Sequence, residues 1–202
     1  MTGSSHVPAI NEDVRHQILE AAFTRFGHYG YNKTTMAEIA EDAGMSAANL
    51  YRYFENKQEI AAACASRCMC QRIDLLRDTV RHTGHSASER LHNYVMTMLI
   101  DCHETFSDET KINEVVTFIT NERTDLIYQK IEAQHSLISE ILAYGNQTGE
   151  FDVEDVITTA KSIYTAIVVF DVPLFMSLYP LEEFKEKARN VVNLILEGLK
   201  KR

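Results

Sequence analysis

The segment 44–57, GMSAANLYRYFENK, concentrates side chains that can bind a polyanion. Tyr51, Tyr53 and Lys57 are suited to hydrogen bonds with phosphate oxygens. Such contacts fix the position of a protein on a nucleic acid without reading the base sequence. Arg52 adds a further cation to the same stretch. Asn49 can both donate to and accept from a base edge, where a side-chain amide suits adenine best. The segment therefore has the chemistry of a DNA contact.

Small and hydroxyl-bearing residues surround these groups. Two alanines at the start of the segment would allow a close approach to base edges, and a helix that begins at a Ser or Thr cap presents free N–H groups that bind phosphate. The complete set of predicted DNA contacts is Thr34, Thr35, Ser46, Ala47, Ala48, Asn49, Tyr51, Arg52, Tyr53 and Lys57.

Two short helices must position this set, over residues 36–43 and 47–54. Thr35 with Glu38 forms a capping-box pattern, Ser46 is a good N-cap, and Gly44 can take the positive φ of a tight turn. Helices this short need a third helix to pack on, and a helix running to about Gly27 supplies it. The unit is a helix-turn-helix or, on the pattern alone, an ordinary helical hairpin with tyrosines on its surface.

The whole chain is predicted to be all-α. The 202 residues include only 8 Gly and 3 Pro, and no strand-like alternation of useful length appears. Beyond the hairpin we expect six more helices, with starts near Asn56, Ser86 or Ser88, Ser107-Asp108, Thr124-Asp125, Asp152 and Pro180. The eighth would run from Asp152 to Pro173.

Several classes of protein are disfavoured. The amino end lacks a secretory signal and no apolar run is long enough for a membrane helix, so we expect a cytoplasmic protein with no membrane partner. No nucleophile elbow, phosphate loop, dinucleotide glycine motif or zinc-protease motif is present, which argues against an enzyme and against a cofactor. The net charge of −9 counts against DNA binding, but residues 1–58 carry only a small excess of acidic over basic residues.

The run TTMAEIAEDAGMSAANLYRYFENKQEI resembles the amino-terminal domain of the TetR/AcrR family of transcriptional regulators. Met45, Ala48 and Tyr53 depart from that family's usual residues. The matching positions are Thr34, Thr35, Ile39, Ala40, Ala43, Gly44, Ser46, Leu50, Tyr51, Tyr53, Phe54, Lys57 and Ile60.

The resemblance implies a nine-helix, two-domain regulator, with a DNA-binding domain over 11–56 and a ligand-binding and dimerisation domain over 57–202. It implies a homodimer on a palindromic operator, usually a repressor released by a small-molecule effector. The competing hypothesis is a helical protein that binds small molecules, or senses a metal or thiol state, without acting on DNA.

The last two helices carry apolar residues on more than one face, so they need partners on two sides. A second subunit could be one partner, and the alternative is a pair of fully buried helices in a monomer. The residues predicted at a dimer interface are Ile163, Ile167, Phe170, Val191, Ile195 and Leu199.

An effector pocket is expected among the fourth to eighth helices, because pockets commonly form between bundle helices. Each candidate lining residue is also a plausible plain core residue. The candidates are Met69, Ile73, Met98, Cys102, Phe118, Tyr128 and Tyr164.

Cysteines offer a second kind of sensor. Cys64 and Cys68 are four residues apart, hence on one helical face, and Cys102 lies on the next helix. The spacing is not that of a zinc finger, and free cysteines often behave as small core residues. No metal site is predicted, and a metal or redox role for the three thiols stays an open alternative.

Overall fold

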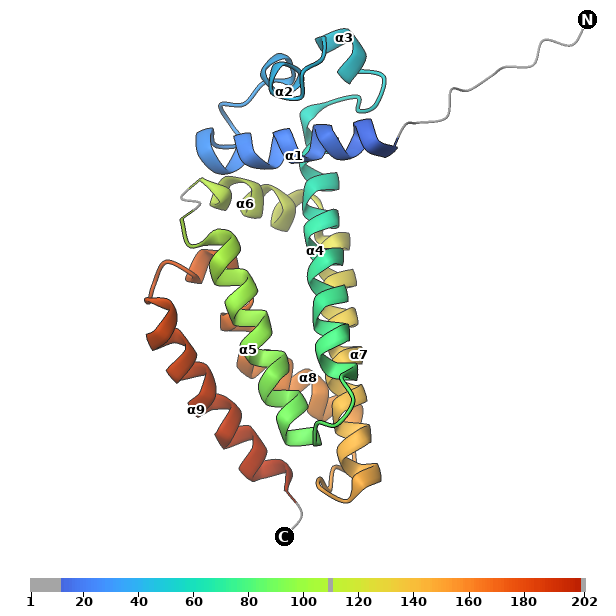
Figure 1. The fold of residues 1–202 in the computed structure, drawn as a ribbon, viewed down its shortest axis with the longest axis vertical. Coiled ribbons are helices and arrows are strands. Elements are labelled where there is room, and N and C mark those ends of the chain that lie inside the picture. Colours follow the sequence, from blue (N-terminus) through green and yellow to red (C-terminus); the bar gives the residue numbers. More distant parts are fainter. Residues whose placement is uncertain (1–11, 109–110, 201–202) are drawn as a thin grey trace, which may run out of the picture.

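The computed structural model describes residues 12–108 and 111–200, where the regular structure is helical apart from one isolated antiparallel bridge between Phe151 and Lys200 (Figure 1). The all-α prediction is confirmed for these residues. The nine α-helices of the described ranges are α1 (Glu12–Tyr29), α2 (Met36–Asp42), α3 (Ala47–Leu50), α4 (Lys57–Arg81), α5 (Ala87–Phe106), α6 (Ile112–Glu122), α7 (Thr124–Thr148), α8 (Val156–Ile167) and α9 (Leu181–Leu199). Two 3₁₀ segments, η1 (Val168–Phe170) and η2 (Pro173–Phe175), connect the last two helices.

The molecule has an amino-terminal end built from α1, α2 and α3 and a longer body built from the other helices (Figure 1). Helix α4 leaves this end and runs the length of the body with α7 packed along it. Helix α6 lies beneath α1 and runs across the direction of α4, so it stands between the two parts. None of the described helices is long and apolar enough to cross a membrane.

Local hydrogen bonds start the short helices where the sequence predicts. Thr35 and Glu38 form a reciprocal capping box at α2, and Ser46 accepts from the Asn49 N–H at α3. Asn56 caps α4 in the same way. Each bond satisfies an N–H group that the helix start would otherwise leave unpaired.

The amino-terminal unit closes around a small apolar core that is continuous with the core of the body. Ile39, Leu50 and Phe54 are all nearly inaccessible to solvent, and Gly44 takes the predicted positive φ, +66°. Ile60 near the start of α4 is also fully buried in the same cluster. The first turns of α4 therefore pack with the amino-terminal unit, while residue 11, the predicted domain start, lies outside the described residues.

Four predicted helix boundaries are wrong. The α-helix after Gly44 ends at Leu50 rather than Phe54, and residues 51–54 continue in hydrogen-bonded turns, with the Tyr53 N–H donating to the Leu50 carbonyl at 2.9 Å. Ser107 follows the end of α5, so α6 starts later, at Ile112.

The third boundary is the start of α8, which Asp155 caps; Asp152 lies before the helix, with its N–H donating to the Leu199 carbonyl. Helix α8 also ends at Ile167, well before Pro173. The two 3₁₀ segments that follow place Asp171 between them, facing inward with 1% exposure. This irregular connection builds part of the site described below.

Candidate functional site

The exposed face of the α3 region carries part of the predicted DNA-contact set. Tyr51 is 55% exposed, and Arg52, Ala48 and Ser46 are also exposed. The Asn49 side chain is half-buried and its amide lies 3.9 Å from the Met45 sulfur, while Ala47 and Tyr53 are half-buried too. A tyrosine hydroxyl, a guanidinium and small side chains thus stand on one exposed face at the tip of the molecule.

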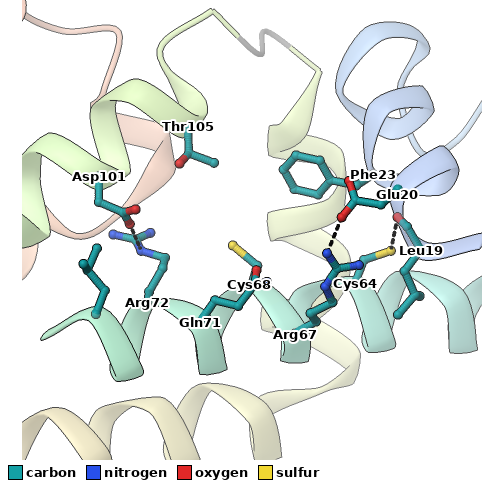
Figure 2. Close-up of a pocket in the computed structure, with 11 residues that line it drawn as sticks. Leu19, Glu20, Phe23, Cys64, Arg67, Cys68, Gln71, Arg72, Asp101 and Thr105 are labelled. Carbon is teal, nitrogen blue, oxygen red and sulfur yellow. Dashed lines mark hydrogen bonds and ion pairs between the residues drawn. The ribbon is translucent and has the colours of Figure 1, made fainter. Parts of the chain in front are cut away.

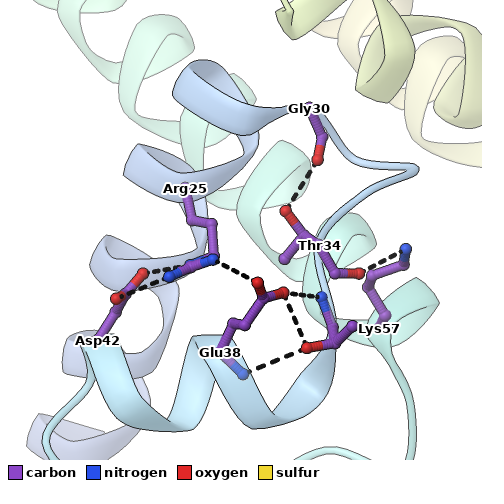
Figure 3. A network of polar contacts seen from close by, with 7 residues as sticks. Arg25, Gly30, Thr34, Glu38, Asp42 and Lys57 are labelled. Atoms are coloured by element: carbon purple, nitrogen blue, oxygen red, sulfur yellow. Dashed lines mark hydrogen bonds and ion pairs between the residues drawn. The ribbon is translucent and has the colours of Figure 1, made fainter.

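Thr34 and Lys57 have structural roles in this arrangement. Thr34 is 2% exposed and its hydroxyl donates to the Gly30 carbonyl at 2.8 Å, so the prediction that it contacts DNA is wrong. The Lys57 ammonium donates to the carbonyls of Tyr31, at 2.6 Å, and Thr34, at 2.8 Å, and lies 4.4 Å from the centre of the Tyr31 ring. Figure 3 shows the contact with Thr34. Lys57 therefore holds the turn Gly30–Thr34, here called the 30–34 turn, and its contact with a phosphate stays a prediction.

An ion-pair network orients α2 on α1 (Figure 3). Arg25 contacts Asp42 through two guanidinium nitrogens and Glu38 at 3.1 Å, and Glu38 in turn accepts from the Thr35 N–H at 2.8 Å. The hydrogen bond from Arg25 lowers the pKa of Asp42, and the hydrogen bonds from Thr35 lower the pKa of Glu38. The Thr35 hydroxyl is committed to this network although the residue is exposed. In the sequence, the capping-box pattern of Thr35 and Glu38 was the only sign of this network.

An apolar chamber of about 270 Å³ lies in the body. Of the seven predicted pocket residues, Met69 and Tyr164 line it. Two phenylalanines of α1, Phe23 and Phe26, also form part of its wall, which sequence reasoning missed. The remaining apolar wall comes mainly from α4, α6, α7 and the connection after α8: Ala65, Phe106, Ile112, Val115, Val116, Ile119, Ile127, Ile131, Val168, Val172 and Pro173.

The other five predicted pocket residues lie elsewhere. Met98 and Cys102 are buried in the core behind the chamber, and Tyr128 is 67% exposed. Phe118 stacks on Tyr31 with ring centres 5.0 Å apart, and Ile73 faces a shallow groove between α4 and α7. Helical periodicity placed these residues on inward or outward faces but could not say which inward face borders empty space.

A second cavity of about 430 Å³ opens between α1, α4 and α5 (Figure 2). Arg67 pairs with Glu20 on one side of it and Arg72 with Asp101 on the other, with Cys68 between them. Phe23, Cys64, Cys68 and Arg72 line both this cavity and the apolar chamber. This polar cavity therefore adjoins the chamber, and we call it the portal.

A buried polar network closes one end of the chamber around Asp171. Its carboxylate accepts from Arg72 at 2.9 Å, from Lys130 at 2.6 Å and from the Gln134 amide. Gln134 accepts in turn from the buried Tyr94 hydroxyl. Arg72 Nε also lies 2.8 Å from Asp101, as an ion pair without hydrogen-bond geometry. Helices α4, α5 and α7 are thus tied to the connection between η1 and η2.

The cysteines for which a metal or redox role was left open are shielded from solvent, Cys64 and Cys102 being buried and Cys68 half-buried. Burial raises the pKa of Cys64 to about 12 and that of Cys102 to about 11, and it raises the pKa of Cys68 as well. Thiols rather than thiolates are therefore present at neutral pH, whereas metal binding and nucleophilic reaction need the thiolate. Within residues 12–108 and 111–200, no group of three His, Cys, Asp or Glu side chains is arranged to hold a metal ion.

The predicted dimer residues divide into two groups. Ile163, Ile167, Phe170 and Leu199 are buried inside the protomer, so the prediction that they face a second subunit is wrong. Val191 and Ile195 are half-buried on α9. The apolar residues that α8 and α9 leave exposed are Ile157, at 59%, and Leu194, at 76%.

Two family sequence models match the chain. The model for bacterial regulatory proteins of the TetR family matches residues 18–64, and the model for a tetracyclin repressor-like C-terminal domain matches residues 87–192. The second match alone covers more than half of the chain.

Curated relatives and solved structures agree with these matches. The chain is 29% identical to the uncharacterized HTH-type transcriptional regulator YvkB of Bacillus subtilis, over 68% of this chain and 75% of that protein. It is 28% identical to the biofilm operon icaADBC HTH-type negative transcriptional regulator IcaR of Staphylococcus epidermidis, over 46% of this chain and about half, 49%, of that protein.

The structure of a putative TetR-family regulator from Mesorhizobium loti superposes with a TM-score of 0.79 at 16% identity, over 96% of this chain and all of that one. A transcriptional regulator from Cytophaga hutchinsonii gives 0.73 at 23% identity, over 92% of this chain and 98% of that one. These two likenesses show the shared fold, and the sequence matches over both parts of the chain show the family. The chain belongs to the TetR family of bacterial transcriptional regulators.

Proposed function

We propose that this protein is a transcriptional repressor that binds a palindromic operator as a homodimer and leaves it when a small apolar molecule occupies the chamber. Tyr51, Arg52 and Asn49 would supply the DNA contacts, with the α2 and α3 helix starts near the backbone. The curated relative IcaR, a negative regulator, supports repression over activation.

The observation that carries the proposal is the position of α6 between the chamber and the DNA-binding unit. Val115 and Ile119 of α6 line the chamber. On another face of the helix, the Glu114 carboxylate accepts from the Asn32 N–H at 2.8 Å and Phe118 stacks on Tyr31. A ligand that moves α6 would therefore move the 30–34 turn from which α2 begins.

The contact between α6 and the 30–34 turn is close. A Cβ placed on Gly30 would lie 2.9 Å from both carboxylate oxygens of Glu114, and Gly30 has a φ of +92°. The Tyr31 ring is held between Phe118 on one side and the Lys57 ammonium on the other. Packed contacts of this kind transmit a shift because they cannot be compressed.

The homodimer is proposed to form through the outer faces of α8 and α9. Ile157 and Leu194 are exposed there, and the half-buried Val191 and Ile195 lie on the same helix as Leu194. A symmetric pairing of the two helices would cover all four side chains and give the two-fold axis that a palindromic site requires. Sedimentation at micromolar concentration tests this, and a clean monomer would contradict it.

The DNA-binding proposal is tested with the promoter fragment upstream of the protein's own gene, by fluorescence anisotropy over a salt titration. We expect site-specific binding that Asn49→Ala weakens by about 1–3 kcal/mol. Gln147→Ala, which removes an exposed side-chain amide near the end of α7, is the control and should leave binding unchanged. Absence of a specific complex at low salt would exclude this promoter as the operator and count against autoregulation.

A further inference from the structure

The polar end of the chamber presents hydrogen-bond donors that the protein leaves unused. Lys130 of α7 lines the chamber with its side chain 15% exposed. Its ammonium contacts the Asp171 carboxylate at 2.6 Å and the Asp171 carbonyl at 3.4 Å. An ammonium has three N–H donors, so these two contacts leave one donor for another acceptor.

Tyr164 of α8 supplies a second donor. The residue is 8% exposed and lines the chamber, and its hydroxyl makes no hydrogen bond within the part of the chain that the structure describes. Burial, helped by the charge of Asp171, raises the pKa of Tyr164. The hydroxyl therefore keeps its proton and can donate it in a hydrogen bond to an acceptor on a ligand in the chamber.

Free acceptors are scarce at the same end. The Asp171 carboxylate already accepts from Arg72, Lys130 and Gln134. Asp101 pairs with Arg72 on the portal side. A cationic ligand would therefore find no uncommitted carboxylate in the chamber, and burying its charge without a partner would be unfavourable.

The remainder of the chamber can bind only apolar groups well. Phe23 and Phe26 of α1 and the α6 residues Val115 and Ile119 are typical of its wall. Chambers of this type orient a ligand by one or two polar contacts and bind the rest of it by burial of apolar surface.

We infer that the effector is an apolar molecule with one hydrogen-bond-accepting head group, a carboxylate or a carbonyl, held by Lys130 and Tyr164. The apolar part then lies against α6 and the α1 phenylalanines. This inference rests on the proposed role of the chamber as the effector site, and it adds the class and the orientation of the ligand.

Three probes with unbranched alkyl chains of similar length test the head group. They are decanoate, 2-decanone and decyltrimethylammonium, measured by titration calorimetry on the full chain without DNA. We expect decanoate and 2-decanone to bind and the ammonium compound to bind at least about tenfold more weakly, because it offers no acceptor. The two binding probes separate a charged head from a neutral one.

Two variants test the residues. Lys130→Met should weaken decanoate at least about tenfold and Tyr164→Phe a few-fold. Lys161→Met, an exposed lysine on α8, and Tyr128→Phe, an exposed tyrosine on α7, are the matched controls and should bind as the unaltered protein does. Far-ultraviolet circular dichroism and the melting temperature confirm that each variant is folded.

Three results would overturn the inference: equal binding of the ammonium compound, unchanged decanoate binding in a folded Lys130→Met variant, or no binding of decanoate and 2-decanone. Promoter binding by the same preparation is measured separately. If it persists while the probes fail, the ligand chemistry is wrong and the DNA-binding proposal stands. If the probes bind but the promoter does not, the ligand inference stands and this promoter is excluded as the operator.

Discussion

In the amino-terminal unit, Arg25, Glu38 and Asp42 are ion-paired on the surface between α1 and α2, whereas in the body Arg72 and Asp171 pair in the interior. The Asp42 and Glu38 side chains are 36% and 41% exposed, while that of Asp171 is 1% exposed. Water screens the first group and is excluded from the second. Similar charged residues therefore have different consequences in the two regions.

The difference matches what each region has to do. Helices α2 and α3 of the unit are short, so surface ion pairs and caps fix how they are presented, at small cost if one is lost. The body needs an apolar chamber, and its charges are gathered at one end, where each depends on the others.

Asp171→Ala should give the largest loss of stability. It leaves Arg72 and Lys130 partly buried without their shared carboxylate, so the free energy of unfolding should fall by about 3–5 kcal/mol in urea denaturation. Asp152→Ala, an exposed aspartate, is the control and should change it by less than about 0.5 kcal/mol. A loss below about 1 kcal/mol for Asp171→Ala would show that the interior pairs behave like the surface ones.

Lys57→Met should lower the stability of the fold and leave the salt dependence of DNA binding unchanged. The carbonyls of Tyr31 and Thr34 lose their donor, which should lower the free energy of unfolding by about 1–3 kcal/mol. The slope of log affinity against log salt should stay the same for Lys57→Met and fall by about 0.9 per lost phosphate contact for Arg52→Met. A reduced slope in Lys57→Met would restore the phosphate role that the sequence predicted.

Thr35→Ala should cost about 1 kcal/mol of stability, because it removes the capping box at α2. Chemical denaturation monitored by circular dichroism measures this. Thr24→Ala, an exposed threonine within α1, should change stability by less than about 0.5 kcal/mol. An equal effect at the two positions would mean that the cap has no special role.

Protonation of Asp42 should have the smallest effect, lowering the free energy of unfolding by a few tenths of a kcal/mol. Its folded pKa lies below the ordinary value of 3.8, so its contribution is complete above about pH 3.8 and is lost as the pH falls through the lowered pKa. A carboxyl NMR titration should show the pKa of Asp42 returning toward 3.8 in Arg25→Met. No change on removing Arg25 would contradict the surface network.

Features formed by neighbours in the chain were predictable. The Thr35–Glu38 capping box, the caps at Ser46 and Asn56 and the positive φ of Gly44 depend on residues within three positions of one another, so the sequence shows them directly. Helix ends were less predictable where distant groups compete, as at Asp152, whose N–H is taken by Leu199.

The all-helical class, the helix-turn-helix and the family were predictable from the sequence, because helix periodicity, caps and the 34–60 motif are local patterns. The packed structure was needed to show that Thr34 and Lys57 hold a turn, and that Met69 and Tyr164 line the chamber while Met98 and Cys102 do not. Arg72 and Asp171 are 99 residues apart, and no local pattern relates them. Such pairs meet only when the helices pack, because packing fixes which of several apolar faces borders a cavity and which charges share the interior.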